Sequence, residues 1–269
     1  MKPLYILKLG GSVVTDKDKE GFSVKKGLID EISREIKNAK EKKDFDLILI
    51  HGAGAAGHQL AMEYKLVEGT GENKEKIYGA LLSQLSNQKL NREIFEIFLE
   101  NGLDVTPIHT ASTVVQAGGE IAEFNSDCLK EALKKNFIPL LYGEMVFDKS
   151  KGMSICSGDS IAPHIANKLG ADRILYATDV DGIYTQDPYQ NSQAELIEEI
   201  SYGRIKKKIK LSSSHNIDTT GGLKKKILRL EKFFSGGGDK TAEIFNGNQP
   251  ENFSKILLDT FFKHTKIEK

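Results

Sequence analysis

ILIHGAGAAGH, residues 48–58, is the stretch around which the chain is organised. Residues 47–50 form an apolar run that predicts a buried strand, and residues 59–64 have helical composition. The strand ends in small residues, which let backbone N–H groups approach an anion, and a helix N-terminus adds partial positive charge. His58 stands where that helix is expected to begin, so it can donate to the same anion. A plain strand–turn–helix corner with an incidental histidine explains this stretch alone equally well.

The composition is that of a soluble globular protein. Of the 269 residues, 28% are charged and 39% hydrophobic, and the formal net charge is zero. This balance gives no sign of a nucleic-acid or membrane partner. No run approaches the roughly 18 apolar residues of a membrane span, and no signal peptide is recognisable, so we expect a cytoplasmic protein. Cys128 and Cys156 form no disulfide or metal framework and are expected to be free thiols.

A second strand, residues 4–9, also enters a glycine turn, Gly10-Gly11-Ser12. The two glycines allow close backbone approach, and Lys8 would point at whatever the turn holds. The alternative for Lys8 is an edge-strand lysine that reaches solvent. Lys17, by itself, is most simply interpreted as a surface-loop lysine.

Polar residues recur at three further boundaries. Ser157-Gly158-Asp159 precedes an apolar helix, residues 161–169, which Ser157 or Asp159 could simply cap. A strand, residues 173–178, runs into Asp179-Val180-Asp181-Gly182, and ligands bind at such strand ends in parallel sheets, although this can also be only a turn. Asp218-Thr219-Thr220-Gly221-Gly222 opens a helix with lysines at 224–226. Positive charge is unfavourable there unless an anion is bound.

Strands and helices alternate along most of the chain. This predicts an α/β fold, an αβα sandwich whose central, mainly parallel sheet lies between helical layers. Residues 185–216 are expected to be loop-rich, with the lysines around 206–210 on a solvated face, and a final amphipathic helix is expected to include Phe261. Neither a Walker loop nor a dinucleotide-binding fingerprint explains the glycines.

Five motifs in this order resemble those of the amino acid kinase superfamily, over almost the whole chain. They are Lys8–Ser12, the loop from His51 to His58, Ser157–Asp159, Ala177–Tyr184 and Asp218–Gly222. Within the superfamily, the histidine-bounded glycine loop is similar to that of isopentenyl phosphate kinases. The resemblance implies a single domain over residues 1–269, with the amino acid kinase fold. It implies ATP-dependent phosphorylation of isopentenyl phosphate to isopentenyl diphosphate in an alternative mevalonate pathway.

The resemblance also implies roles for single residues. Lys8, Lys17 and Lys226 would stabilise the transferring phosphoryl group, and Asp159 would orient the lysines. His58 would bind the acceptor phosphate, together with backbone groups at Ala53, Gly54 and Gly158. The nucleotide would lie along Lys8, Gly10, Gly11, Ser12, Gly54, Thr178, Asp179, Tyr184, Gly222 and Lys226.

The resemblance extends to partners and to lobes. Mg²⁺ would be carried mainly by the nucleotide phosphates, with no dedicated protein metal site. Residues 1–150 would supply the acceptor pocket and the contact of a homodimer, and residues 151–269 the nucleotide pocket. Neither nucleic acid nor membrane is expected as a partner.

Four positions depart from the family pattern. Ala53 stands where glycine is usual and Ala56 where an aromatic residue is usual, while Glu144 and Ser160 each replace an aspartate. Ala53 is tolerated if its φ is negative, and Ala56 predicts a larger or differently shaped acceptor pocket. A kinase of another small phosphate or phosphonate, such as fosfomycin, is one alternative. A non-catalytic nucleotide-binding protein on the same fold is the other.

Overall fold

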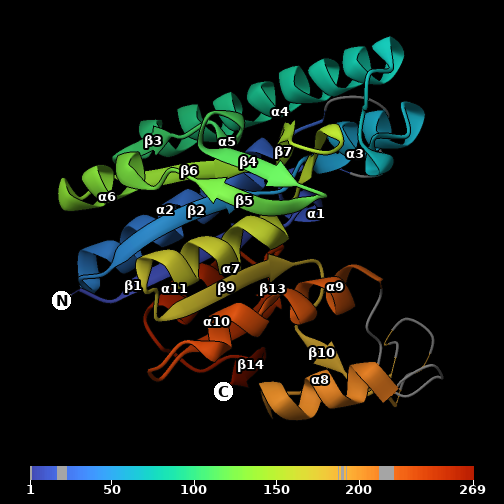
Figure 1. Cartoon of the computed structure of the whole chain (residues 1–269). Coiled ribbons are helices and arrows are strands. Elements are labelled where there is room, and N and C mark those ends of the chain that lie inside the picture. The colour runs from blue at the N-terminus through green and yellow to red at the C-terminus, as the bar shows by residue number, and fades with distance from the viewer. Residues whose placement is uncertain (1, 17–22, 187, 189–190, 192, 212–220) are drawn as a thin grey trace.

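An eight-stranded sheet forms the centre of the molecule (Figure 1). The computed structural model describes residues 2–16, 23–186, 188, 191, 193–211 and 221–269. The strands are β1 (Leu4–Leu9), β2 (Asp46–His51), β3 (Val105–Pro107), β6 (Ile138–Tyr142), β9 (Arg173–Thr178), β12 (Glu199–Ser201), β13 (Thr241–Asn246) and β14 (Thr265–Glu268). Their order is β12-β14-β13-β9-β1-β2-β6-β3.

Six neighbouring strands of this sheet are parallel, from β13 through β9, β1, β2 and β6 to β3. β14 is antiparallel to β13, and β12 is parallel to β14. The prediction of a mainly parallel sheet is therefore confirmed. Because parallel strands end at one edge, the segments after β1, β2 and β9 meet there.

Helices cover both faces of the sheet because its strands are apolar on both. On β1, Leu4 and Ile6 belong to one buried cluster, whereas Tyr5, Leu7 and Leu9 belong to the other. The first face is covered mainly by α6 (Asp127–Lys134), α7 (Gly158–Leu169), α8 (Tyr202–Leu211), α9 (Gly221–Arg229) and α10 (Glu231–Ser235), and the second by α1 (Gly11–Val14), α2 (Lys26–Lys42), α4 (Lys74–Glu100) and α11 (Glu251–Leu257). The predicted helical layers are confirmed.

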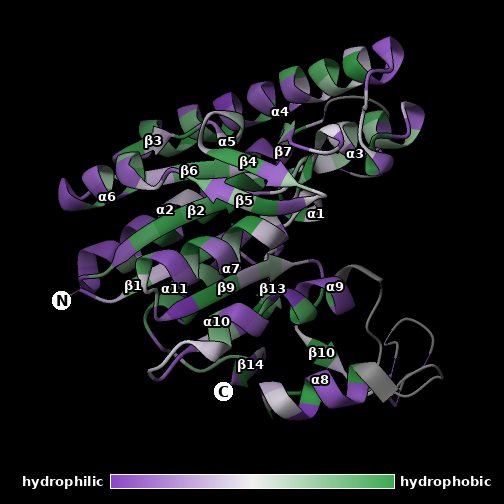
Figure 2. Ribbon diagram, viewed as in Figure 1, coloured by the Kyte–Doolittle hydropathy of each residue, from purple (hydrophilic) through white to green (hydrophobic). Residues whose placement is uncertain are grey.

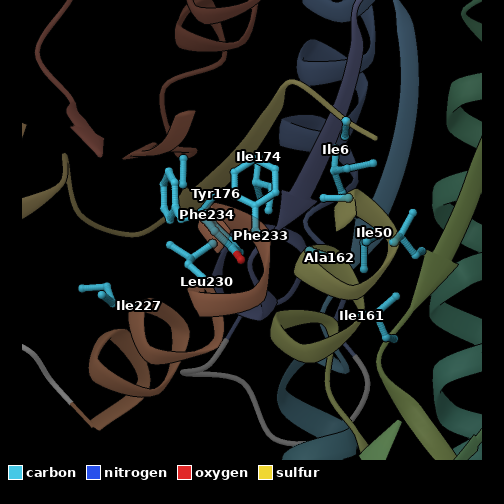
Figure 3. Close-up of a cluster of buried hydrophobic side chains, with 14 of the residues drawn as sticks. Ile6, Ile50, Ile161, Ala162, Ile174, Tyr176, Ile227, Leu230, Phe233 and Phe234 are labelled. Atoms are coloured by element: carbon cyan, nitrogen blue, oxygen red, sulfur yellow. The ribbon is translucent and has the colours of Figure 1, made fainter. Parts of the chain in front are cut away.

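The hydropathy of the elements follows these layers (Figure 2). The central strands are mostly hydrophobic, whereas α2 and α4 alternate between hydrophobic and hydrophilic residues along their length. On the first face, Ile161 and Ala162 of α7 lie near Ile6 and Ile50, as Figure 3 shows. None of the helices in the described residues is long and apolar enough to cross a lipid bilayer.

A separate four-stranded sheet has the order β5-β4-β7-β8. Asp148 holds its turns together. It accepts hydrogen bonds from the Gly118 and Gly119 N–H groups, at 3.0 and 2.7 Å, and from the side chains of Ser150 and Ser154. Its strands are β4 (Val114–Ala117), β5 (Glu120–Phe124), β7 (Glu144–Asp148) and β8 (Gly152–Cys156), and β4 and β5 form an antiparallel hairpin. The short helix α5 (Thr110–Thr113) precedes β4.

Three sequence-based expectations were wrong. α3 (Gly54–Glu63) begins within the small-residue stretch rather than after it, because Gly54 can adopt φ +69°. The described part of residues 185–216 contains β11 (Leu196–Ile197), paired with β10 (Ile183–Tyr184), as well as β12 and α8. The last helix ends at Leu257, and Phe261 is 81% exposed beyond it. A 3₁₀ turn, Leu66–Glu68, follows α3.

Candidate active site

Lys8, Asp159 and Lys226 meet at the edge where the parallel strands end. Lys8 lies near the end of β1, Asp159 is the second residue of α7, and Lys226 lies on α9. Both ammonium groups contact the same carboxylate oxygen, with Nζ–Oδ1 distances of 3.2 Å for Lys8 and 2.9 Å for Lys226. Lys8 and Asp159 stand in separate sequence motifs and the family resemblance added Lys226, and the fold brings the three side chains together.

The ion triad of Lys8, Asp159 and Lys226 lies in the protein interior, and its surroundings shift the pKa values of Asp159 and Lys226. Lys8 and Lys226 are buried. Burial is the main cause that lowers the pKa of Lys226, to about 8; the charge of Lys8 acts in the same direction, and Asp159 opposes both. Burial alone would raise the pKa of Asp159, but the two lysines hold it well below its usual range. The triad therefore carries one net positive charge at neutral pH, which suits an anionic ligand.

A cavity of about 330 Å³ adjoins the triad. One part of its lining is polar or glycine-rich and includes Lys8, Gly11, His58, Gly158 and Asp159. The remaining lining is largely apolar and includes Ala61, Met62, Val67, Met145 and Ile155. A ligand with an anionic group and a short apolar tail matches this division.

The glycine turns after β1 and β2 pack directly against each other. The Gly10 N–H donates to the Ala177 carbonyl at 2.9 Å, and a Cβ on Gly10 would lie 2.8 Å from that oxygen. A Cβ on Gly52 would lie 2.8 Å from the Gly11 nitrogen. Gly54 has φ +69°, and a Cβ added at this position would lie 2.6 Å from Thr15 Cγ2. These contacts place the first turns of α1 and α3 side by side.

The loop that was expected to hold the acceptor spans the end of β2 and the first turns of α3. Ala53 has φ −64°, the negative value that an alanine requires there. His58 is exposed and lines the cavity, but it lies inside α3 rather than at its first residue. Ala56 is absent from the cavity lining, because Ala53, Gly57 and Ala61 occupy the helix face that borders the cavity. The volume removed at Ala56 therefore does not open onto this cavity.

The residues expected along the nucleotide occupy the neighbouring strand ends. Thr178 ends β9, and its hydroxyl donates to the Val180 carbonyl at 2.9 Å. Tyr184 lies on β10 and donates to Asp181 at 2.9 Å. The remaining positions are Gly10, Gly11 and Ser12 at the start of α1, Asp179 after β9 and Gly222 in the first turn of α9. Lys17 and residues 218–220 lie outside the described residues.

The chain is similar to proteins of one known family over most of its length. The family model described as the amino acid kinase family matches residues 3–246. The chain belongs to the amino acid kinase family. An isopentenyl phosphate kinase of Methanocaldococcus jannaschii is 37% identical over 95% of each chain, and one of Methanothermobacter thermautotrophicus is 30% identical over 98% of each. A solved isopentenyl phosphate kinase structure superposes with a TM-score of 0.81 at 29% identity, covering 98% of this chain and 99% of the other.

Sequence reasoning missed part of this amino acid kinase site. Ser83 and Asn87 of α4 line the cavity, although no motif contains them. Asn87 donates to the Gly143 carbonyl at 3.2 Å, and Asn91, one turn later, contacts Nε2 of the buried His51 at 3.2 Å. Polar residues at 83, 87 and 91 share one helix face, and all three are buried. That spacing of polar residues within an amphipathic helix was the available signal.

Proposed function

We propose that this chain is an isopentenyl phosphate kinase, which phosphorylates isopentenyl phosphate with ATP and yields isopentenyl diphosphate in an alternative mevalonate pathway. The observation that carries the proposal is the cavity beside the triad, with an anion-attracting end at Lys8 and His58 and apolar walls elsewhere. A short apolar tail suits those walls, and a phosphate suits the other end. Two relatives that match this chain over nearly its whole length are named isopentenyl phosphate kinases, which supports the same acceptor.

The reaction proposed is a direct in-line transfer. An oxygen of the acceptor phosphate forms the new bond to the γ-phosphorus as the bond to the β-phosphate oxygen breaks, and ADP leaves. Lys8 and Lys226 stabilise the charge on the transferred group, with Lys17 as a third cation. Asp159 orients Lys8 and Lys226 through the shared Oδ1 contact. No general base is required because the acceptor oxygen is already ionised.

The acceptor phosphate is proposed to lie at the cavity end bordered by α3 and α7. His58 and the backbone groups of Ala53, Gly54 and Gly158 would hold it there. Ala53 and Gly158 line the cavity, and the first N–H groups of a helix have no acceptor within their own helix. Partial positive charge at the two helix starts favours the same dianion.

The nucleotide is proposed to lie on the other side of the triad. Gly10, Gly11, Ser12 and Gly54 would approach its phosphates, while Thr178, Asp179, Tyr184 and Gly222 border the rest. Lys8 and Lys226 face both substrates. Mg²⁺ would enter on the nucleotide phosphates.

The two halves of the domain are proposed to divide these tasks. Residues 1–150 would supply the acceptor site and the contact of a homodimer, and residues 151–269 most of the nucleotide site. Along α4, Tyr78, Leu81 and Leu85 are about half exposed at helical spacing. Such a stripe on an outer helix suits a second copy of the chain. We also propose a cytoplasmic location.

Isopentenyl phosphate turnover tests the proposal directly. We expect strong ADP release with Mg-ATP and isopentenyl phosphate, and weaker release with dimethylallyl phosphate, geranyl phosphate, fosfomycin, UMP and N-acetylglutamate. Turnover of fosfomycin alone would overturn the acceptor assignment and keep the phosphoryl-transfer chemistry. No turnover with any acceptor would favour a nucleotide-binding protein without catalytic activity.

His58→Ala tests the acceptor site. Losing one hydrogen bond to a charged phosphate costs about 1.5–3 kcal/mol, so the KM for isopentenyl phosphate should rise about 10- to 100-fold while that for ATP changes little. Gln59→Ala is the matched control, since Gln59 is exposed on the same helix and does not line the cavity. Equal effects of His58→Ala on both KM values would contradict the role.

A further inference from the structure

Three carboxyl groups are buried in the described part of the chain, and only one of them has few partners. Glu243 accepts two hydrogen bonds from Arg173, each of 2.8 Å, and contacts His264. Asp148 accepts hydrogen bonds from several backbone and hydroxyl groups. Glu144, by contrast, is 2% exposed and has no ion-pair partner among the described residues.

Among the described residues, Glu144 has only uncharged hydrogen-bond donors around it: the Ala111 N–H, the Tyr142 hydroxyl and the Gln88 side chain. Its Oε2 accepts the Ala111 N–H at 3.0 Å, whereas its Oε1 is buried without a hydrogen-bond partner. Asn87, which binds the carbonyl of the preceding residue, likewise has a buried Oδ1 without a partner. Glu144 and Asn87 both line the cavity next to the triad. Two residues that line the cavity therefore each have one buried side-chain oxygen without a hydrogen-bond partner among the described residues, and neither oxygen is itself exposed to the cavity.

A buried carboxylate without a cation is costly, and the usual response is protonation. Burial is the main cause that raises the pKa of Glu144 to about 7, and its hydrogen-bonding neighbours only partly offset this. A proton on Oε1 also allows this oxygen, which accepts no hydrogen bond, to act as a hydrogen-bond donor. In the ionised form, the same group would place a negative charge in the wall of a cavity proposed to hold a dianion.

We propose that Glu144 is a specificity-determining residue that supports acceptor binding only while its carboxyl group is protonated. The inference rests on the proposed function, because it assumes an anionic acceptor in this cavity. Ionisation of Glu144 sets the upper pH limit for acceptor binding. ATP binding is unaffected, because Glu144 lies in the acceptor wall, away from the strand ends after β9.

Other titratable groups around Glu144 come from several elements. On β6, the Tyr142 hydroxyl is a hydrogen-bonding neighbour of the Glu144 carboxyl and lies 2.6 Å from His109 Nδ1, and the Tyr142 ring stacks on His51 of β2. His51 is neutral near pH 7, because burial lowers its pKa to about 4. Cys156 of β8 pairs in register with Glu144, and burial raises the pKa of its thiol to about 12. α4 contributes the uncharged side chains of Asn87 and Gln88.

The other titratable groups that line the cavity are Lys8, His58 and Asp159. Asp159 stays ionised and paired, and the triad is unchanged by a substitution at Glu144. The acceptor phosphate itself loses its second proton near pH 6. A comparison of two proteins that differ only at position 144 cancels these contributions.

Glu144→Gln is the decisive variant, since glutamine keeps the shape of a protonated glutamate. The KM for isopentenyl phosphate is measured for both proteins between pH 6 and 9. We expect similar values below pH 6.5. By pH 8.5 the wild-type KM should exceed that of the variant by about tenfold, as expected for a charge acting across several ångströms of protein. The KM for ATP should stay equal in the two proteins at every pH.

A second measurement does not depend on activity. Because the folded-state pKa of Glu144 is raised, its contribution to stability is full below its unfolded pKa near 4.3 and is lost as pH rises through about 7. The melting temperature of Glu144→Gln relative to wild type should therefore rise between pH 5 and 8. Parallel curves, or an acceptor KM ratio that does not change with pH, would overturn the proposal. Absence of isopentenyl phosphate turnover in wild type would instead overturn the proposed function, and the melting curves would still test the state of Glu144.

Discussion

Asp159 is the residue that allows two lysines to share the site. Without it, the ammonium groups of Lys8 and Lys226 would repel each other in a buried setting, and burial already lowers the pKa of Lys226 to about 8. Because one carboxylate oxygen contacts both ammonium groups, it fixes the positions of the two lysines and also offsets their positive charge. A capping role for Asp159, the simpler interpretation from the sequence, does not account for these contacts.

Asp159→Asn should therefore change both the rate and its pH dependence. In wild type, kcat should fall above about pH 8 as Lys226 loses its proton. Loss of the opposing charge should move this decline to lower pH by about one unit and reduce kcat about 100-fold. The measurement is kcat against pH, with Glu123→Gln, a surface ion-pair partner of Lys149, as the control. An alkaline decline at the same pH as wild type would contradict the assignment to Lys226.

Helix starts at the ends of strands define the anion side of the site. α3 and α7 both begin beside the cavity, and Thr15 links α1 to α3. Its hydroxyl accepts the Ala55 N–H and donates to the Gly11 carbonyl, both at 2.9 Å. The left-handed conformation of Gly54 makes this contact possible, since it turns the chain from β2 into α3 within two residues.

Gly54→Ala should destabilise this junction. A left-handed alanine costs about 1–2 kcal/mol, and its Cβ would also overlap Thr15 and displace it from Ala55. We expect a loss of about 3 kcal/mol in the free energy of unfolding, measured by urea denaturation. Gly27→Ala on α2 is the matched control. Nothing lies within 4 Å of its added methyl group, so its effect should range from neutral to about 1 kcal/mol stabilising. Equal losses in the two variants would refute the strain argument.

Across the whole molecule, the sheet brings two halves of the chain to one edge. β1 lies between β2 and β9, so the proposed acceptor loop after β2 and the proposed nucleotide segment after β9 flank Lys8. The opposite side of the proposed acceptor half ends in α4, whose outer residues Tyr78, Leu81 and Leu85 remain exposed. The site and the proposed dimer contact therefore lie on different faces of this helix.

Leu81→Glu combined with Leu85→Glu tests that contact. Burying two carboxylates in an apolar interface is unfavourable, so a wild-type dimer should become a monomer in sedimentation velocity. Phe261→Glu is the control, because Phe261 is 81% exposed after α11 and lies outside the proposed interface. A monomeric wild type, or a double variant that stays dimeric, would contradict the assignment.

Several features followed from local order along the sequence. The apolar runs at β1, β2 and β9, the glycines after them and the alternation of strands with helices predicted the sheet and indicated the edge at which these strands end. Lys8 and Asp159 were candidates on local grounds, because they stand beside a glycine turn and at a helix start, whereas the roles of Lys17 and Lys226 came only from the family resemblance. The start of α3 was misplaced, because a left-handed Gly54 lets helix geometry begin where composition indicates a loop.

Which of these residues meet depends on the packing of the folded chain. Asp159 reaches Lys8 and Lys226 across long chain separations, and no local pattern specifies a shared carboxylate oxygen. Likewise, Asn87 and Glu144 become part of the cavity because α4 and β7 pack beside it. The uncompensated burial of Glu144 arises from that packing, since exposure and missing partners are properties of the folded environment.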